Sequence, residues 1–398
     1  MIRAFLGGLL HGAMLAVAQA LTSPSAVLPV FIKALTGSDW AVGALVSGMQ
    51  LGAALAGLPA AAFVEPAPRK KVFLYLAIAV RASAFLLLAV LTLLFAETRP
   101  AVVVYTLLFS LVLFAVFGGL GGVAYLPVIG KAIPPGYRGL FFGARSMLAS
   151  LAGGLAGLLS RPLWGRFPEG FALAFFLAFL ALVVGFWGFW LIPEPPDPPR
   201  GERKSFWQRT RAVLSLLKKP KLRMLLFSYL LVGLYFLALP FYAVAAREAG
   251  LPAEALAYLV AVSALAEGLN LFLGRWMDRA GAHVGVRAVA VLAFLAPLVA
   301  YLGEGLWAAV LVFMLVGVVL NGIENAYSAY LLSCAPREEA AGHTALLYLA
   351  SAPRALWPLV GAALAGALGY RGLFLVTAGV LFVAVVYAFR LPKAAEHH

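Results

Sequence analysis

Long apolar segments separated by short polar stretches run through the whole sequence. Twelve can be delimited, at roughly 4–32, 40–63, 71–95, 101–129, 138–160, 170–192, 221–245, 252–273, 284–302, 305–333, 340–368 and 371–390. A helix needs about 20 mostly apolar residues to cross a membrane. The pattern therefore predicts an all-α polytopic membrane protein with twelve transmembrane helices.

Composition excludes a water-soluble fold. Hydrophobic residues make up 64% of the chain, charged residues only 12%, and the mean hydropathy is +0.98. Soluble domains are about half apolar and a quarter charged. The net charge of +14 is spread between the apolar segments, so it indicates topogenic charge and contact with membrane lipids, and we expect no nucleic-acid partner. The single cysteine, Cys334, excludes an internal disulfide framework.

The segments divide into two sets of six. We predict an N-terminal six-helix bundle at 1–192, a linker at 193–220, a C-terminal six-helix bundle at 221–392 and a tail or tag remnant at 393–398. The halves resemble each other: Gly-Gly-Val-Ala-Tyr at 121–125 aligns with Ile-Glu-Asn-Ala-Tyr at 323–327. Duplicated bundles around a central site are a common transporter design.

The linker and the loops set the expected orientation. Prolines open the linker, and its basic stretch from Lys204 to Lys219 carries apolar residues on one helical face, which predicts a helix on the membrane surface. A regulatory partner site is the alternative. Placing both termini in the cytoplasm puts there the linker and most loop lysines and arginines, as the positive-inside rule requires. We expect a multi-pass protein of the bacterial cytoplasmic (inner) membrane, with the first span retained.

One loop resembles a family signature. Gly274-Arg-Trp-Met-Asp278-Arg279-Ala-Gly281, between the eighth and ninth segments, is similar to the Gly-x-x-x-Asp-Arg-x-Gly loop of the major facilitator superfamily. Its first-half counterpart keeps Glu65 and Arg69 but lacks both glycines. The resemblance implies the major facilitator fold, with a gating role for this loop. The alternative is a solvated turn with topogenic arginines.

Shorter phrases narrow the resemblance. Leu-Thr-Ser-Pro-Ser-Ala-Val-Leu-Pro at 21–29 and Pro-Pro-Gly-Tyr-Arg-Gly at 134–139 are similar to a broad group of bacterial facilitators of unassigned substrate. The glycine-rich stretch at 152–157 lacks the Gly-Pro found in drug antiporters of the superfamily.

Ionisable residues inside the predicted spans are the candidate functional groups. Such residues are costly in the bilayer, by roughly 2.5–3.5 kcal/mol on insertion scales, and therefore need a partner or a cavity. Glu324 and Arg354 fall on consecutive segments and could pair, with Glu324 exchanging its arginine for a coupling proton. Glu267 is a second proton-coupling candidate. A fixed structural pair is the alternative for Glu324 and Arg354.

The candidate substrate-binding residues are Arg81, Gln19, Asn321, Asn325, Arg354 and Tyr229. Gln19 and Asn321 rest on the family resemblance, which places helices 1, 4, 7 and 10 around the central cavity. Arg81 serves either anion recognition or helix–helix contact. Arg145 is nearer the interface, where arginine commonly extends its guanidinium to the headgroups. His11 is expected to be a shallow polar residue.

The predicted function is secondary active transport of a small organic solute, anionic or amphipathic, by alternating access with protons as coupling ion. Alternatives are an uncoupled facilitator, a lipid or amphiphile transporter of the same fold, and a non-transporting membrane receptor. No nucleophile–base set, metal-ligand spacing or phosphate-binding loop is evident, so we expect no enzyme, no metal and no cofactor. We expect a monomer.

Overall fold

The fold is all-helical. The computed structural model describes residues 2–64, 67–197, 220–334, 347 and 350–393, and every regular element within these ranges is a helix. Ten helical segments among them are long and apolar enough to cross a membrane. The helix α3 (Asp39–Val64) is also long enough, and Gly369 divides the last of the ten segments with a non-helical backbone. The predicted twelve-helix fold is therefore confirmed.

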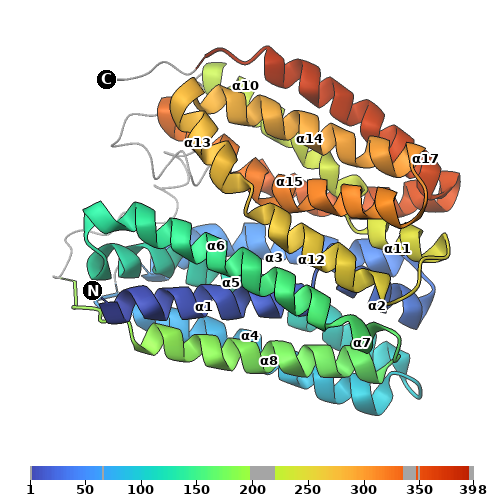
Figure 1. Cartoon of the computed structure of the whole chain (residues 1–398), viewed down its shortest axis with the longest axis horizontal. Coiled ribbons are helices and arrows are strands. Elements are labelled where there is room, and N and C mark those ends of the chain that lie inside the picture. Colours follow the sequence, from blue (N-terminus) through green and yellow to red (C-terminus); the bar gives the residue numbers. More distant parts are fainter. Residues whose placement is uncertain (1, 65–66, 198–219, 335–346, 348–349, 394–398) are drawn as a thin grey trace.

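The first half begins with a broken helix and continues with five further spans. Its elements are α1 (Ile2–Leu21), α2 (Val27–Thr36), α3, α4 (Lys71–Phe95), α5 (Pro100–Ala132), α6 (Pro135–Leu159), α7 (Arg161–Trp164) and α8 (Glu169–Trp190). Figure 1 shows α1, α4 and α8 along one side of the molecule.

The second half follows after residue 220. Its elements are α10 (Pro220–Gly233), η2 (Leu234–Leu237), α11 (Phe241–Glu248), α12 (Ala255–Glu267), α13 (Asn270–Ala280), α14 (Ala282–Leu302), α15 (Gly305–Cys334), η4 (Ala352–Leu356) and α17 (Trp357–Phe389). The predicted surface helix at 204–219 lies outside the described residues, and the predicted domain boundaries stay predictions.

The first helix of each half is interrupted. Pro24 lies between α1 and α2, so the single span expected at 4–32 is corrected to two helices. In the second half, a 3-10 turn and Pro240 separate α10 from α11. Proline removes a backbone donor and ends a helix. Each break follows a first helical segment of 14 residues or more. It therefore lies in the later part of the span, away from the residue at which the span begins.

Small residues allow the helices to pack closely. A Cβ atom on Gly317 of α15 would lie 2.0 Å from the carbonyl oxygen of Ser263 in α12. One on Gly7 of α1 would lie 2.2 Å from the carbonyl oxygen of Gly188 in α8. Side chains at these positions would push the backbones apart. Close approach through glycine is the usual packing mode in lipid, where apolar surface alone does not drive helices together.

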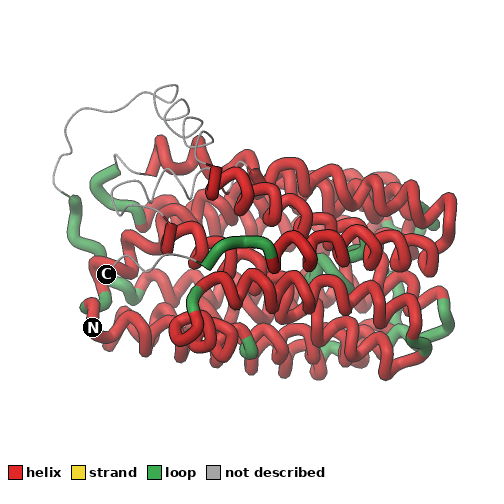
Figure 2. Tube along the Cα trace, turned by 90° about the horizontal axis from the view of Figure 1, so that it is seen from above, coloured by secondary structure: helices red, strands yellow, loops and turns green. Residues whose placement is uncertain are grey.

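The helices run lengthwise between two ends of the molecule (Figure 2). Both chain termini lie at one end, which we call the terminal end; the opposite end is the distal end (Figure 1). The two halves meet mainly through α6 with α12 and through α3 with α17 and η4. Along α6 these contacts run from Ser150 to Gly157, whereas Gly136, Gly139 and Gly143, nearer the terminal end, have open space at their Cβ positions.

A polar cluster joins the two halves at the distal end. Lys33 of the first half lies 2.8 Å from Asp39 and 3.2 Å from Glu248 of the second half. The hydroxyl of Tyr370, also in the second half, donates to Asp39 at 2.7 Å and lies 3.3 Å from Glu248. We call these four residues the distal latch. The latch and the α6–α12 contacts bring the halves together at and near the distal end.

Candidate functional site

Three of the predicted site residues form one cluster in the second half. The Nη1 of Arg354, in η4, lies 2.5 Å from the Oε1 of Glu324 in α15. The hydroxyl of Tyr229, in α10, is 2.9 Å from both carboxylate oxygens. The ion pair is asymmetric: the side chain of Arg354 is 3% exposed and that of Glu324 is 47% exposed. The carboxylate thus has a fixed cation on one side and open space on the other.

Aromatic rings hold Arg354 in place. Its guanidinium carbon lies 3.8 Å from the centre of the Tyr229 ring and 5.7 Å from that of Phe236. Gly233 leaves room for the stem, because a Cβ atom there would approach the Nε of Arg354 to 3.0 Å. Cation–π contact adds about 2 kcal/mol or more when the partners are desolvated. The arginine is therefore anchored mainly by packing, and Glu324 is its one ion-pair partner among the described residues.

The polar residues of α15 share one exposed face. Asn321, Glu324 and Asn325 are all exposed, whereas the neighbouring Ile323 and Ala326 are buried. Residues three and four apart lie on the same side of a helix. Polar side chains of a spanning helix usually face the bundle interior or a water-filled cavity, since lipid cannot solvate them. Asn325 makes no hydrogen bond within the part of the chain that the structure describes.

Glu267 lies beside the same face. Asn321 is within hydrogen-bonding reach of its carboxylate. One turn further, the amide of Asn270 donates to the backbone oxygens of Glu267 and Val318, each at 3.2 Å, and so ties the junction of α12 and α13 to α15. Glu267, at the end of α12, thus meets α15 at Asn321, and Glu324 lies one turn further along α15.

Arg81 lies in the first half, on α4. Its guanidinium carbon is 3.7 Å from the centre of the Phe114 ring on α5 and 3.8 Å from the Cβ position of Gly118. Its Nε is buried and has no hydrogen-bond partner among the described residues. Gln19, on α1, is exposed and makes no hydrogen bond to any described residue. Within the described residues, no hydrogen bond or ion pair joins either residue to the Glu324 cluster.

Arg145, expected near the membrane interface, packs between helices of the first half. Its stem lies against Gly12 of α1, where a Cβ atom would lie 2.7 Å from its Cγ, and its guanidinium carbon is 5.1 Å from the Tyr125 ring centre. The neighbouring His11 is buried, with its ring 4.0 Å from that of Phe189. In the sequence, the spanning segments that carry these two residues contain no acidic residue. This was the available sign that Arg145 has no ion-pair partner on its own span.

The signature loop of the second half closes α13. Gly281 has φ 91°, a backbone conformation that favours glycine, and its N–H donates to the carbonyl oxygen of Met277 at 2.8 Å. Gly274 lies within α13, and Asp278 and Arg279 are exposed. Neither charged residue forms an ion pair within the described ranges. The turn geometry therefore explains Gly281, and the gating role of the loop stays a prediction.

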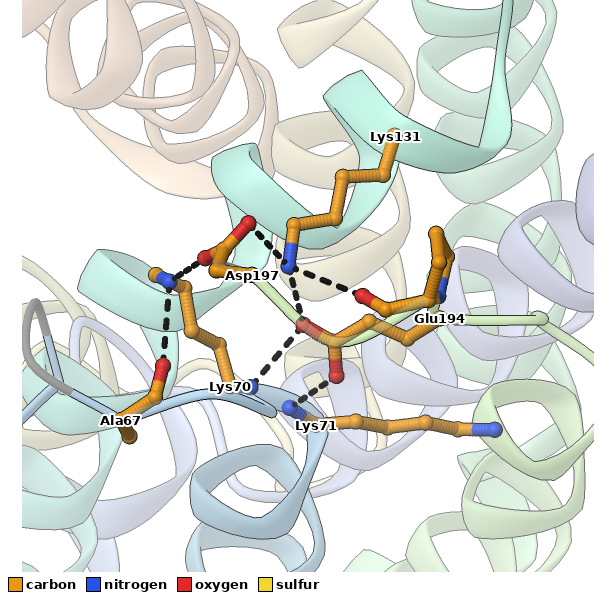
Figure 3. Close-up of polar contacts among 7 residues, drawn as sticks. Ala67, Lys70, Lys71, Lys131, Glu194 and Asp197 are labelled. Atoms are coloured by element: carbon orange, nitrogen blue, oxygen red, sulfur yellow. Dashed lines mark hydrogen bonds and ion pairs between the residues drawn. The ribbon is translucent and has the colours of Figure 1, made fainter. Parts of the chain in front are cut away.

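The first-half counterpart is built from other residues than those expected (Figure 3). Glu65 lies outside the described residues, and Arg69 is exposed. Instead, the two carboxylate oxygens of Glu194 accept the backbone N–H groups of Lys70 and Lys71 at 2.9 and 2.8 Å. These N–H groups are at the start of α4, so the carboxylate caps a helix N-terminus, where negative charge is favourable.

A second acid completes this terminal-end cluster. Asp197 pairs with the ammonium groups of Lys70 and Lys131, the latter at 2.9 Å. Lys131 also lies 2.9 Å from Glu194. The Lys70 and Lys131 ammonium groups lower the pKa of Asp197 to about 2. In the sequence, the acidic residues Glu194 and Asp197 directly follow the sixth span, and basic residues lie at the ends of two other spans. These opposite charges were the available sign of the cluster.

Comparison with known proteins gives the family. The family model described as Major Facilitator Superfamily matches residues 5–353. Similar solved structures include a mutant of the nucleoside transporter NupG (TM-score 0.76, 13% identity, 98% of this chain and 100% of that chain). An auto inhibited POT family peptide transporter has TM-score 0.73, 15% identity and coverage of 100% and 98%. A D-xylose-proton symporter has TM-score 0.69, 16% identity and coverage of 99% and 98%.

These identities are low, so the structural likenesses show the fold alone. A comparison with curated protein sequences finds no match. The family model nevertheless covers most of the chain, with a matching fold and span number. The chain therefore belongs to the Major Facilitator Superfamily.

Proposed function

We propose that this chain is a proton-coupled secondary active transporter that moves a small organic solute by alternating access. The observation that carries the proposal is the half-exposed carboxylate of Glu324, paired with the buried Arg354 inside a membrane-spanning segment. The arginine is enclosed, whereas the half-exposed acid can be reached by a proton. Glu324 can therefore exchange its arginine partner for a proton.

The chemistry of coupling follows from the two surroundings of Glu324. When the carboxylate is ionised, Arg354 and the hydroxyl of Tyr229 stabilise it. A proton arriving from the exposed side would neutralise the acid and release Arg354. Each protonation state would therefore favour a different arrangement of α15 relative to η4, as a coupled conformational change requires.

Glu267 is the second candidate in this proposal. Asn321 is within hydrogen-bonding reach of Glu267 and lies one turn from Glu324 on α15. A change at one acid can therefore alter the hydrogen bonding of the other. We assign Asn321 and Asn325 to the solute path because they are exposed on the same helical face as Glu324. Gln19 is a further polar group that an α1-lined path would present.

The arrangement of the halves supports alternating access. The distal latch closes one end, whereas the contacts along α6 stop before its terminal-end turns. Basic residues collect at the terminal end, including Lys70 and Lys71 at the start of α4 and Lys131 at the end of α5. By the positive-inside rule we place this end in the cytoplasm of a bacterial inner membrane, with the chain acting as a monomer and opening inward in this state.

The proposal is tested in proteoliposomes that contain the pH indicator pyranine. Solutes of varied class are added one at a time, and the pH inside is recorded. We expect at least one solute to move protons in the wild type. Glu324→Gln should abolish this proton movement while equilibrium exchange of the same radiolabelled solute persists, because exchange needs no net proton transfer.

A matched control is Glu304→Gln. Glu304 is at the distal end, 81% exposed, and pairs with Arg371 at 2.7 Å, so its loss should leave proton movement unchanged. Solute uptake that ignores the pH gradient in the wild type would replace coupling with the uncoupled facilitator. Unchanged proton movement in Glu324→Gln would remove Glu324 from the coupling step.

A further inference from the structure

The two halves carry different charge inside the membrane. In the second half, Arg354 is neutralised by Glu324. In the first half, Arg81 and Arg145 lie ten residues into α4 and α6, about 15 Å from the terminal end of each helix at 1.5 Å per residue. Both guanidinium groups lie against α5, that of Arg81 at Phe114 and that of Arg145 at Tyr125, so they share one region of the bundle.

No acid in the described residues neutralises these two arginines. Residues 1–192 contain four acidic residues. Asp39 begins α3, Glu97 follows α4 and Glu169 begins α8, which places all three at the distal end; Glu65 lies outside the described residues. Neither arginine forms an ion pair with the described part of the chain, and the Nε of each is buried without a hydrogen-bond partner.

One face of α5 connects the two guanidinium groups. Arg81 lies against Gly118, and Arg145 lies over the ring of Tyr125. Seven residues separate these positions, which is two helical turns and on the order of 10 Å along the axis. Gly122 falls between them on the same face; it is exposed, and its Cβ position has no heavy atom within 4 Å. Space is therefore open above Gly122, between the positions on α5 that the two cations contact.

We propose that Arg81 and Arg145 form a two-point anion site, and that the transported solute is an elongated organic anion with an acidic group at each end. The proposal rests on the proposed transport function and names its substrate class. One acidic group binds Arg81, the other binds Arg145, and the connecting chain lies over Gly122. Guanidinium binds carboxylates through paired hydrogen bonds, and both groups here still have donors to offer.

With this site, the solute binds in the first half and the proton binds in the second half. A dianion would cancel the two uncompensated charges of the first half, which are costly to keep in a membrane. Arg354 is already engaged by Glu324, so we remove it from direct substrate binding and keep it in the coupling step. Substrate binding and proton binding then occur in different bundles, and the rocking of one against the other links them.

The test measures binding by the purified full-length chain in detergent. The probes are succinate, adipate, suberate and sebacate, with octanoate as the monoanion, all at constant ionic strength. The readout is the apparent melting temperature, because a ligand of the native state raises it. We expect the longer dicarboxylates to stabilise the wild type by several degrees, with suberate or sebacate best and octanoate clearly weaker.

Variants then assign the binding groups. Arg81→Gln and Arg145→Gln should each weaken suberate binding about tenfold or more, because a charge-assisted hydrogen-bond pair is lost. Each should bind suberate no better than octanoate. Arg99→Gln, which removes one exposed charge from the same half, is the control and should retain the wild-type preference.

Gly122→Leu tests the connecting space without touching a charge. The side chain would fill open space, so we expect the variant to fold and to lose suberate binding. Gly379→Leu, also with an open Cβ position but on α17, is the matched control and should bind normally. This pair keeps the test decisive even if an arginine variant fails to fold.

The outcomes separate this proposal from the transport function. Equal stabilisation by octanoate and suberate, or no dependence on chain length, would overturn the two-point site. Retained suberate binding in Arg81→Gln, Arg145→Gln and Gly122→Leu would do the same. If no dicarboxylate binds while another solute drives proton movement in proteoliposomes, the anion site is wrong and the transporter assignment stands.

Discussion

The Oε1 of Glu324 lies 2.5 Å from the Nη1 of Arg354, yet the side chain of Glu324 is 47% exposed and that of Arg354 only 3%. The two side chains come from α15 and from the 3-10 turn that precedes α17. Because the arginine is enclosed by aromatic rings, it cannot follow the carboxylate far. Any exchange of partner must therefore occur at the acid.

The ion pair predicts that removing the acid lowers stability and that removing the arginine as well restores it. Glu324→Ala leaves a buried guanidinium without an ion-pair partner, which costs about 3 kcal/mol, near the lower limit for a broken buried pair because the acid is half exposed. We expect a lower apparent melting temperature in detergent. The double variant Glu324→Ala with Arg354→Met should recover most of the loss, since the charge that lacks a partner is gone. Additive losses in the double variant would contradict this account.

The fold was readable from the sequence because lipid imposes simple rules. Each span must be long, apolar and helical. The breaks at Pro24 and Pro240 were harder to place, since proline is tolerated in spanning helices when neighbours restore the lost hydrogen bonds. Nothing in the local pattern states whether a proline bends a helix or ends it.

The site was readable where the partners come from neighbouring segments. Glu324 and Arg354 were expected to pair because their helices are consecutive, and they do. Arg145 was harder to judge, because Gly12, against which its stem packs, lies on α1, more than a hundred positions away. The cap formed by Glu194 on α4 joins residues more than a hundred positions apart, and hydropathy patterns carry no information about such pairs.

The terminal-end cluster makes stability depend on pH. Lys70 and Lys131 lower the pKa of Asp197 from its ordinary 3.8 to about 2. A carboxyl with a lowered folded-state pKa adds stability above its unfolded value, and that stability is lost as the pH falls through the folded value. Asp197→Asn should thus melt below the wild type at pH 7, and the gap should close between about pH 4 and pH 2. Asp278→Asn, whose carboxylate forms no ion pair within the described residues, should show no such gap; a constant gap for Asp197→Asn at all pH values would refute the linkage.

The signature loop should be sensitive at Gly281. Its φ of 91° is unfavourable for any residue with a Cβ atom, and such an atom would lie 2.9 Å from the Nδ1 of His283. Gly281→Ala should therefore lower stability by about 1–2 kcal/mol, measured as a shift in apparent melting temperature. Gly274→Ala, in a helical position with open space, should be neutral or slightly stabilising. A neutral Gly281→Ala would mean that the turn relaxes without cost.

The distal latch should control which end of the molecule opens. Tyr370→Phe removes the hydrogen bonds to Asp39 and Glu248 and leaves the ring in place. The hydroxyl has one proton and donates to one acid at a time; losing one such bond costs about 0.5–1.5 kcal/mol, so the distal-open state should gain up to about tenfold in population. A reporter is available at Ala362, which is 1% exposed and lies against Gly43 of the other half.

The measurement uses Ala362→Cys in a Cys334→Ser background, labelled with a membrane-impermeant maleimide from the distal side. Tyr370→Phe should label several-fold faster than the parent, because the reporter becomes accessible only when the halves separate there. Tyr301→Phe is the control, since its hydroxyl has no hydrogen bond within the described residues and lies outside the latch. Equal labelling rates in parent and Tyr370→Phe would show that the Tyr370 hydroxyl does not help to hold the distal end closed.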